Sequence, residues 1–178
     1  SLVAACLGER VYLEKPSGSR ILRVYPNLYT LFLGPPANWK SYATSAAVSL
    51  LRQAPYTETL NLYQGKITSA AMYDAMATGI PDSEHYRPWN SRIYLVNDEL
   101  SNDLGDSANA DTMLRALTKL FIPGEPFSDS TRWHGRVNLT DYVVNWSACT
   151  TETWLLDRVD ANMLEGGLFT RVCVTEAG

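Results

Sequence analysis

The sequence contains little cysteine and little histidine: its 178 residues include three cysteines and two histidines. Cys6, Cys149 and Cys173 are odd in number and lack metal-ligand spacing, so a disulfide framework is not favoured. We expect them to be buried free thiols in a reducing, cytoplasmic compartment. The two histidines, His85 and His134, have no cysteine partners nearby and do not indicate a metal site.

Long apolar runs and an excess of positive charge are also absent. No stretch approaches the length of a membrane span, and no charged leader precedes an apolar one, so we expect no membrane partner. The formal net charge of −4 argues against a surface coated in basic patches, so any DNA binding must be local. At 46% hydrophobic the chain can bury one core, and we expect a single domain. A start at Ser1 is compatible with a piece of a longer polypeptide.

The segment GPPANWKS, residues 34–41, is the most informative part of the chain. Its spacing is that of the phosphate-binding P-loop, G-x-x-x-x-G-K-[ST], in which loop N–H groups and a helix N-terminus surround a phosphate chain. The apolar run 28–33 before it predicts a buried strand, and the apolar spacing after it predicts a helix that stops before Pro55. The alternative is an ordinary surface turn. The expected ATP-binding residues are Gly34, Pro35, Pro36, Ala37, Asn38, Trp39, Lys40 and Ser41.

Within this loop, Lys40 would reach the β- and γ-phosphates and Ser41 would ligate Mg²⁺. Trp39 departs from the pattern, because it stands where the second glycine belongs. Glycine tolerates a positive φ and a close approach to phosphate. We therefore expect Trp39 to hold an ordinary αR or β conformation, which would make the loop a variant with weakened or altered nucleotide binding. Stacking on a base or packing against a neighbouring subunit are other uses for its ring.

A second apolar run, residues 93–96, ends at Asn97, Asp98 and Glu99. Four apolar residues followed by Asp-Glu match the Walker B pattern. Asp98 would lie on the Mg²⁺ side, and Glu99 would be the general base that activates water. The alternative is a strand that simply ends in a polar turn.

A third predicted strand begins at Tyr142 and leads to a polar end over residues 145–151. In ring-forming P-loop ATPases the strand next to Walker B ends in a polar residue that contacts the γ-phosphate or the attacking water. Thr150 is our first candidate for this polar residue, followed by Thr151 and Asn145. Thr151 also suits the N-cap of a helix over 151–159, and both roles are compatible at the carboxyl edge of a sheet.

Near the C-terminus, Gly166 and Gly167 precede a short predicted strand over 168–174 that carries Arg171. One interpretation of Arg171 is a solvated strand residue. The other is an arginine finger that neutralises transition-state charge in the site of an adjacent subunit.

Together these segments resemble the ATPase domain of phage and mobile-element primase-helicase-type proteins, AAA+-like relatives of superfamily 3 and MCM-type helicases. The resemblance spans roughly residues 20–176, and the two Walker segments are its specific part. The Gly-x-Phe-x-x-Arg-like ending of the family matches Gly167, Phe169 and Arg171 only loosely. The segments that carry the resemblance are GPPANWKS, YLVNDE, WSACTT and EGGLFTRV, with YPNLYTLFLGPP and GKITSAAMYDAM.

The resemblance implies a ring-forming motor that uses ATP and Mg²⁺ to unwind or translocate DNA. In such rings a hairpin between the Walker B strand and the next one grips DNA in the central pore. Arg132, His134 and Arg136, around Trp133 and Gly135, are the expected DNA contacts, because arginines bind phosphate and aromatic rings stack on bases. The alternative is an exposed hairpin without that role.

The expected fold is α/β: a three-layer αβα P-loop NTPase with a mostly parallel central sheet. Residues 1–27 are expected to form a helix end and a hairpin that lead into the ATPase core, residues 28–178. Two other functions stay open, a DNA-packaging (terminase-like) or other viral ATPase and a nucleotide-binding module that has lost turnover. The remaining expected segments are a strand at 59–63, a helix at 67–77, a loop at 79–90, a polar loop at 101–111 and a helix at 110–123.

Overall fold

A computed structural model gives the fold of the chain. The residues it describes are 2–7, 11–53, 60–78, 92–104, 107–122, 126–131, 135–139, 142–159 and 167–176. The expected loop at 79–90, the candidate DNA contacts Arg132 and His134, and the first residue of the strand expected at 59–63 lie outside these ranges.

A five-stranded sheet forms the centre of the molecule, and each strand runs parallel to its neighbours. β5 and β8 are buried along their whole length, which explains why apolar residues dominate them on both faces. The expectation of an α/β fold with a mostly parallel sheet is confirmed. In spatial order the strands are β4 (Asn61–Gln64), β5 (Arg92–Asn97), β8 (Val143–Thr150), β3 (Tyr29–Leu33) and β9 (Val172–Glu176).

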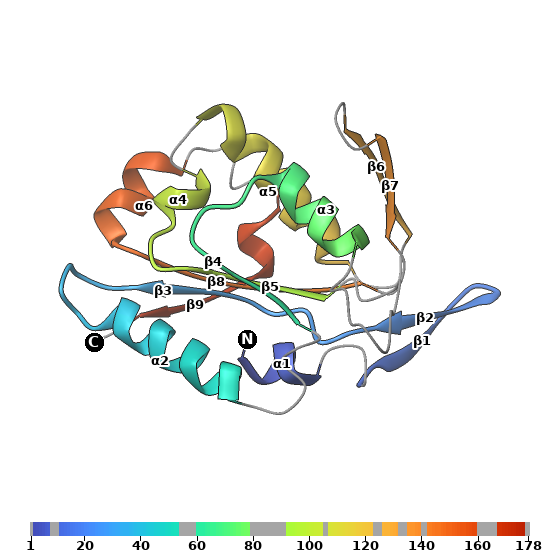
Figure 1. Ribbon diagram of the computed structural model, residues 1–178, viewed down its shortest axis with the longest axis horizontal. Helices are drawn as coiled ribbons and strands as arrows, with labels where there is room; N and C mark the ends of the chain where they lie inside the picture. Colours follow the sequence, from blue (N-terminus) through green and yellow to red (C-terminus); the bar gives the residue numbers. More distant parts are fainter. Residues whose placement is uncertain are drawn as a thin grey trace.

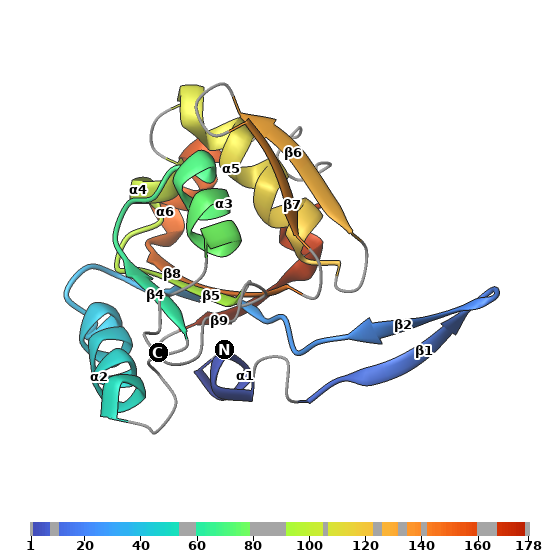
Figure 2. The ribbon, with the colours of Figure 1, turned by 45° about the vertical axis from the view of Figure 1, so that its right-hand side comes forward.

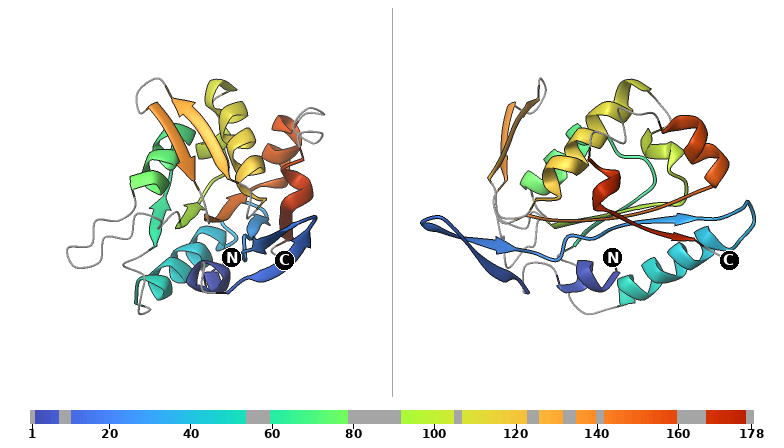
Figure 3. Two further views of the ribbon diagram at one scale, coloured as in Figure 1. Left: turned by 90° about the vertical axis from the view of Figure 1, so that its right-hand side faces the viewer. Right: turned by 180° about the vertical axis from the view of Figure 1, so that it is seen from behind.

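Helices cover both faces of this sheet (Figures 1 and 3). Two of them, α1 (Leu2–Leu7) and α2 (Lys40–Gln53), lie on one face. Among the helices that the structure describes, none is both long enough and apolar enough to cross a membrane. On the other face lie α3 (Ser69–Thr78), α4 (Ser101–Leu104), α5 (Ser107–Leu120) and α6 (Glu152–Arg158).

The larger hydrophobic core lies between the sheet and α3, α4 and α5. Its largest fully buried side chain is Trp146, which meets the Tyr29 ring edge to face at 5.9 Å. The Tyr29 hydroxyl donates to the carbonyl of Leu117 at 2.9 Å, so this buried ring keeps its hydrogen bond. A smaller core beneath α2 contains Val48 and Leu51. The two cores fix the sheet between its helical layers.

Two antiparallel hairpins begin at the amino edge of the sheet, opposite the carboxyl ends of its strands. The β1–β2 hairpin projects from the body, whereas the β6–β7 hairpin packs against α3 and adds buried side chains to the larger core (Figure 2). The first leads into β3 and the second into β8, so chain order alone places both at that edge. Both hairpins were expected from the sequence and are confirmed. Their strands are β1 (Leu13–Ser17), β2 (Arg20–Val24), β6 (Phe127–Thr131) and β7 (Gly135–Leu139).

Three expectations about local structure were wrong. The expected polar loop at 101–111 holds α4 and the first turn of α5, and the buried side chains of Leu100 and Leu104 attach this segment to the core. The strand expected at 168–174 begins only at Val172, after a 3₁₀ turn over Phe169–Arg171. Cys173 is exposed, because β9 is an edge strand, whereas Cys149 is buried as expected.

Asn27 joins three elements just before β3. Its Nδ2 donates to the carbonyls of Leu120 and Phe121 at 3.2 and 3.3 Å, at the end of α5. Its Oδ1 accepts from the amide of Val144, near the start of β8, at 3.1 Å. The side chain of Asn27 therefore connects α5 and β8 to the start of β3, the strand that leads to the loop 34–39.

Asn27→Ala should lower the free energy of unfolding by about 1–3 kcal/mol, since it leaves part-buried backbone groups without partners. Urea denaturation would measure the change. Asn138→Ala is the matched control, because Asn138 is exposed on β7 and should change stability by less than about 0.5 kcal/mol. Equal losses in the two variants would contradict the role assigned to Asn27.

Candidate functional site

The carboxyl ends of β3, β8 and β5 meet at one edge of the sheet. The register pairs Leu33 with Thr150 and Asn97 with Ala148, so these strands end within two residues of one another. The amide of Gly34 donates to the carbonyl of Thr150 at 3.3 Å, which ties the start of the loop to the end of β8. This edge therefore gathers the loop 34–41 and the acidic pair after β5, although both are far apart in the sequence.

The loop 34–39 closes on the side chain of Lys40, the first residue of α2. Its Nζ donates to the carbonyls of Gly34 and Pro35, both at 2.6 Å. At the helix start, the amide of Ala43 donates to the carbonyl of Trp39 at 2.9 Å. The first N–H groups of a helix lack partners within the helix and carry its positive dipole end. The loop thus holds an ammonium group and a helix N-terminus side by side.

Trp39 does not hold the ordinary backbone conformation that we expected. Its φ is 53°, and Ala37 has a φ of 63°, so two non-glycine residues of this loop lie in the left-handed region. The expectation of an αR or β conformation at Trp39 is wrong. The backbone instead takes the left-handed conformation that glycine adopts most readily. Trp39 is therefore in a conformation that is strained for a residue with a Cβ.

Asp98 and Glu99 are exposed and follow β5 directly. The next amide, that of Leu100, donates to the carbonyl of Cys149 at 2.7 Å, so this acidic turn is fixed to the end of β8. The arrangement puts two solvent-facing carboxylates beside the edge at which the loop begins.

The buried thiol of Cys149 lies between the loop helix and the acidic turn. Burial raises its pKa, and a 3.2 Å hydrogen bond with the Thr44 hydroxyl on α2 opposes that shift. The Asp98 carboxylate raises the same pKa further, and the Lys40 ammonium lowers it. Both charged groups therefore lie near enough to this thiol to act on its pKa.

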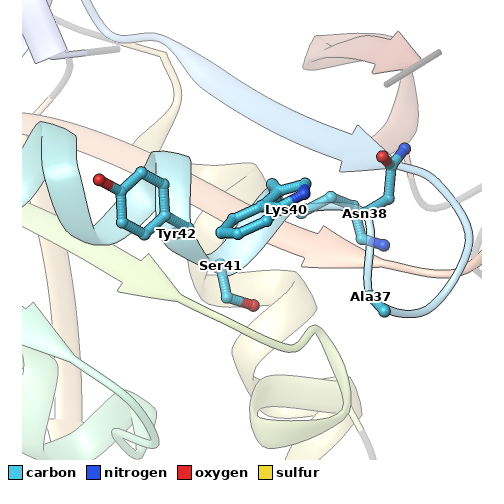
Figure 4. A pocket seen from close by; sticks show the side chains of 6 residues that line it. Ala37, Asn38, Lys40, Ser41 and Tyr42 are labelled. Carbon is cyan, nitrogen blue, oxygen red and sulfur yellow. The ribbon is translucent and has the colours of Figure 1, made fainter.

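A pocket of about 290 Å³ opens along the loop and the first turn of α2 (Figure 4). Figure 4 shows the side chains of Ser41 and Tyr42 leaving the helix in different directions. The Trp39 and Tyr42 rings meet edge to face at 5.6 Å. Tyr42 was not expected from the sequence, because its contact with Trp39 depends on how the loop enters α2. The pocket is lined by Ala37, Asn38, Trp39, Lys40, Ser41 and Tyr42.

The three candidate polar residues near the end of β8 lie in different surroundings. Thr150 is buried beside Gly34, and its Oγ1 has a long contact of 3.5 Å with the carbonyl of Thr151. Thr151 is the N-cap of α6, as expected, and accepts from the amide of Trp154 at 3.3 Å. Asn145 accepts from the amide of Leu28 at 3.0 Å, near the amino end of the strands, so it does not belong to this edge.

Arg171 lies at the amino edge, away from the loop of its own chain. The next residue, Val172, pairs with Tyr29 at the start of β3, and at about 3.3 Å per residue Gly34 is roughly 17 Å further along. The guanidinium donates to the carbonyl of Gly167 and lies over the Phe121 ring, 5.9 Å from its centroid. Arg171 is therefore not part of the site that its own chain forms.

Arg136 is the one candidate DNA contact whose position the structure describes. It is exposed on β7, and its Nε donates to the hydroxyl of Ser128 on β6 at 3.2 Å. The hairpin joins the sheet at the amino edge, so Arg136 does not belong to the loop site.

Comparison with protein-family models finds no match to this chain, and no curated protein matches it either.

The positive φ at Trp39 predicts an inverted order of stability for two substitutions. Trp39→Gly should be more stable than Trp39→Ala by about 1 kcal/mol, because both remove the ring and glycine alone relaxes in the left-handed region. Thermal or urea unfolding of both variants measures the difference.

Ser49, exposed within α2, supplies the matched control. There the order should reverse, with Ser49→Ala more stable than Ser49→Gly by about 1 kcal/mol, because glycine weakens a helix interior. An alanine variant at position 39 that is the more stable one would mean that the loop does not keep its positive φ in solution.

Proposed function

We propose that this chain is an ATP-binding and ATP-hydrolysing motor domain of the P-loop class, a DNA helicase of the primase-helicase type that acts as a ring. One observation carries the proposal: the loop with Lys40 and Ser41 and the turn with Asp98 and Glu99 meet at the carboxyl edge of one parallel sheet. Ligands of open α/β sheets bind at this edge. Two sequence patterns that could each be accidental are thereby joined in space.

The loop would bind the phosphates of ATP. Backbone N–H groups and the start of α2 supply donors and a positive dipole end for an anion. Lys40 donates to the neutral carbonyls of Gly34 and Pro35, and it would exchange them for charged phosphate oxygens. Such charge-assisted bonds are roughly twice as strong as neutral ones, which favours the exchange.

The two oxygen ligands expected for Mg²⁺ fit that ion chemically. The Ser41 hydroxyl and the Asp98 carboxylate are both exposed, and Mg²⁺ is usually held by one or two protein oxygens together with substrate phosphates. When bound, the ion neutralises charge that develops on the phosphate oxygens.

Glu99 would act as the general base of hydrolysis. It would take a proton from a water whose oxygen attacks the γ-phosphorus, while the bond from that phosphorus to the β,γ-bridging oxygen breaks to give ADP and inorganic phosphate. Lys40 would bind the charge that builds up on the γ-phosphate. Thr150, next to the loop, would position that phosphate or the attacking water with its hydroxyl.

The position of Arg171 supports an assembly in which sites are shared. Since it lies about one strand length from its own loop, it could serve as an arginine finger only for a neighbouring copy. The β1–β2 hairpin also extends from the body with exposed Leu13 and Ile21, and a two-stranded hairpin is marginal without a partner (Figure 2). Both features favour a ring of identical chains.

The β6–β7 hairpin would supply the contacts to DNA, through Arg132, His134 and Arg136. One such hairpin per subunit around a pore would concentrate positive charge locally, which a chain of net charge −4 requires. The exposed position of Arg136 on β7 supports this part of the proposal.

ATP hydrolysis measured with Mg²⁺ should fall by about 10²-fold or more in Lys40→Ala and Glu99→Gln, because these variants remove phosphate charge stabilisation and the general base. Lys119→Ala and Asp157→Asn are the controls, since both residues are exposed on helices outside the site. A rate unchanged in either site variant would remove the site as proposed.

Addition of single-stranded DNA separates the helicase from its alternatives. Hydrolysis that DNA stimulates, and that Arg136→Ala makes insensitive to DNA, favours the helicase. Hydrolysis without stimulation favours a packaging or other viral ATPase. Nucleotide binding without hydrolysis favours a module that has lost turnover. The feature that suggests this alternative is Trp39 in place of the second P-loop glycine.

A mixing experiment tests whether Arg171 acts in a neighbouring site. Lys40→Ala and Arg171→Ala should each be inactive alone, and a one-to-one mixture should regain about a quarter of the wild-type rate, the fraction of interfaces in a head-to-tail ring that keep both groups. Melting curves of Arg171→Ala control for loss of its contact with Gly167. Full activity of Arg171→Ala alone would exclude the finger.

A further inference from the structure

We infer that Trp39 and Tyr42 form a stacking seat for the nucleobase of the bound triphosphate, and that this seat accepts any base through its π-face. The inference rests on the proposed function, because it presupposes phosphates in the loop 34–41. It adds a substrate class: nucleoside triphosphates with weak discrimination among bases.

Both aromatic side chains are largely exposed. Trp39 is 74% exposed and Tyr42 is 67% exposed, yet the two rings meet each other and line the same pocket as Lys40 and Ser41. Large aromatic side chains usually bury most of their surface. Two of them standing open beside a predicted phosphate loop offer flat apolar area at the position where a nucleoside would extend from its phosphates.

The backbone conformation of Trp39 is unfavourable for a residue other than glycine. A φ of 53° at Trp39 is unfavourable for any residue with a Cβ, and glycine would relieve that strain. Strained backbone persists where the surrounding structure enforces it, and it clusters at ligand-binding sites. The indole at this position therefore needs a compensating use, and the ring contact with Tyr42 alone leaves most of its surface in water.

The positions of Lys40 and the acidic turn limit where a base can lie. Lys40 and the acidic turn at Asp98 mark the end where the terminal phosphate and Mg²⁺ would lie. The acidic turn follows β5, two strands from β3 in the sheet, so the pocket along the loop and the first turn of α2 offers the base a place apart from the acids. Trp39 and Tyr42 are the aromatic side chains of the pocket lining. Stacking on such rings tolerates every base, because every base has a π-face.

Binding of two ligands tests this inference: ATP and inorganic tripolyphosphate, each with Mg²⁺, measured by calorimetry. Trp39→Ala should weaken ATP binding about ten- to a hundredfold and leave tripolyphosphate binding within about twofold, because only ATP carries a base to stack. Trp39→Phe should restore most of the ATP affinity, and GTP and CTP should bind the wild type within about tenfold of ATP. Tyr63→Ala removes an exposed ring on β4 and serves as the control.

The outcomes separate failure of the inference from failure of the proposed function. If Trp39→Ala weakens ATP and tripolyphosphate equally, the ring only supports the loop and the seat is overturned while the phosphate site stands. If Trp39→Ala changes neither affinity but lowers the mass of the particle in solution, the pair belongs to a subunit contact and the seat is again overturned. If the wild type binds neither ligand, the proposed function fails and the inference with it.

Discussion

The position of β8 between β3 and β5 is the constraint on which the rest of the structure depends. Eight buried residues of β8 pair on one side with the strand that enters the loop and on the other with the strand that ends in Asp98 and Glu99. Neighbouring strands lie about 4.8 Å apart, so this insertion separates the loop from the acids by roughly 10 Å. The parallel register of the three strands therefore brings the loop and the acids to the same end of the sheet, with the end of β8 between them.

The carboxyl and amino ends of the sheet also carry different groups. The carboxyl end of β8 ties Gly34 through Thr150 and the acidic turn through Cys149, so the chemistry of the proposed site gathers there. The amino edge carries both hairpins and Arg171. A head-to-tail ring brings unlike surfaces of neighbouring copies together, so groups at one edge can serve a site formed at another. A chain whose proposed phosphate loop and arginine lie far apart is suited to that kind of assembly.

Much of this arrangement could be predicted from the sequence, because buried parallel strands are nearly continuous apolar runs and the helix after the loop carries regular apolar spacing. Thr151 as an N-cap followed from its side chain and the residues after it. The conformation of Trp39 could not be predicted in this way, since local preference argues against a positive φ. The start of the loop is fixed by the hydrogen bond from Gly34 to Thr150, a tertiary contact, and its end enters α2 through the helical bond from Ala43 to Trp39, so the path between them is not set by local preference alone. The helices within the acidic segment 101–111 could not be predicted either, because its one leucine, Leu104, is too few to give a helical pattern.

Trp39 therefore changes in meaning between sequence and structure. In the sequence it argues against a phosphate-binding loop, because it replaces the glycine that the pattern requires. In the structure Trp39 has the positive φ that glycine adopts readily, so the loop has a glycine-like backbone at this position. A residue that lowers stability without changing the local fold is the kind expected where function outweighs stability. The exposed indole beside Tyr42 gives that function a physical form, a flat apolar surface next to a predicted anion site.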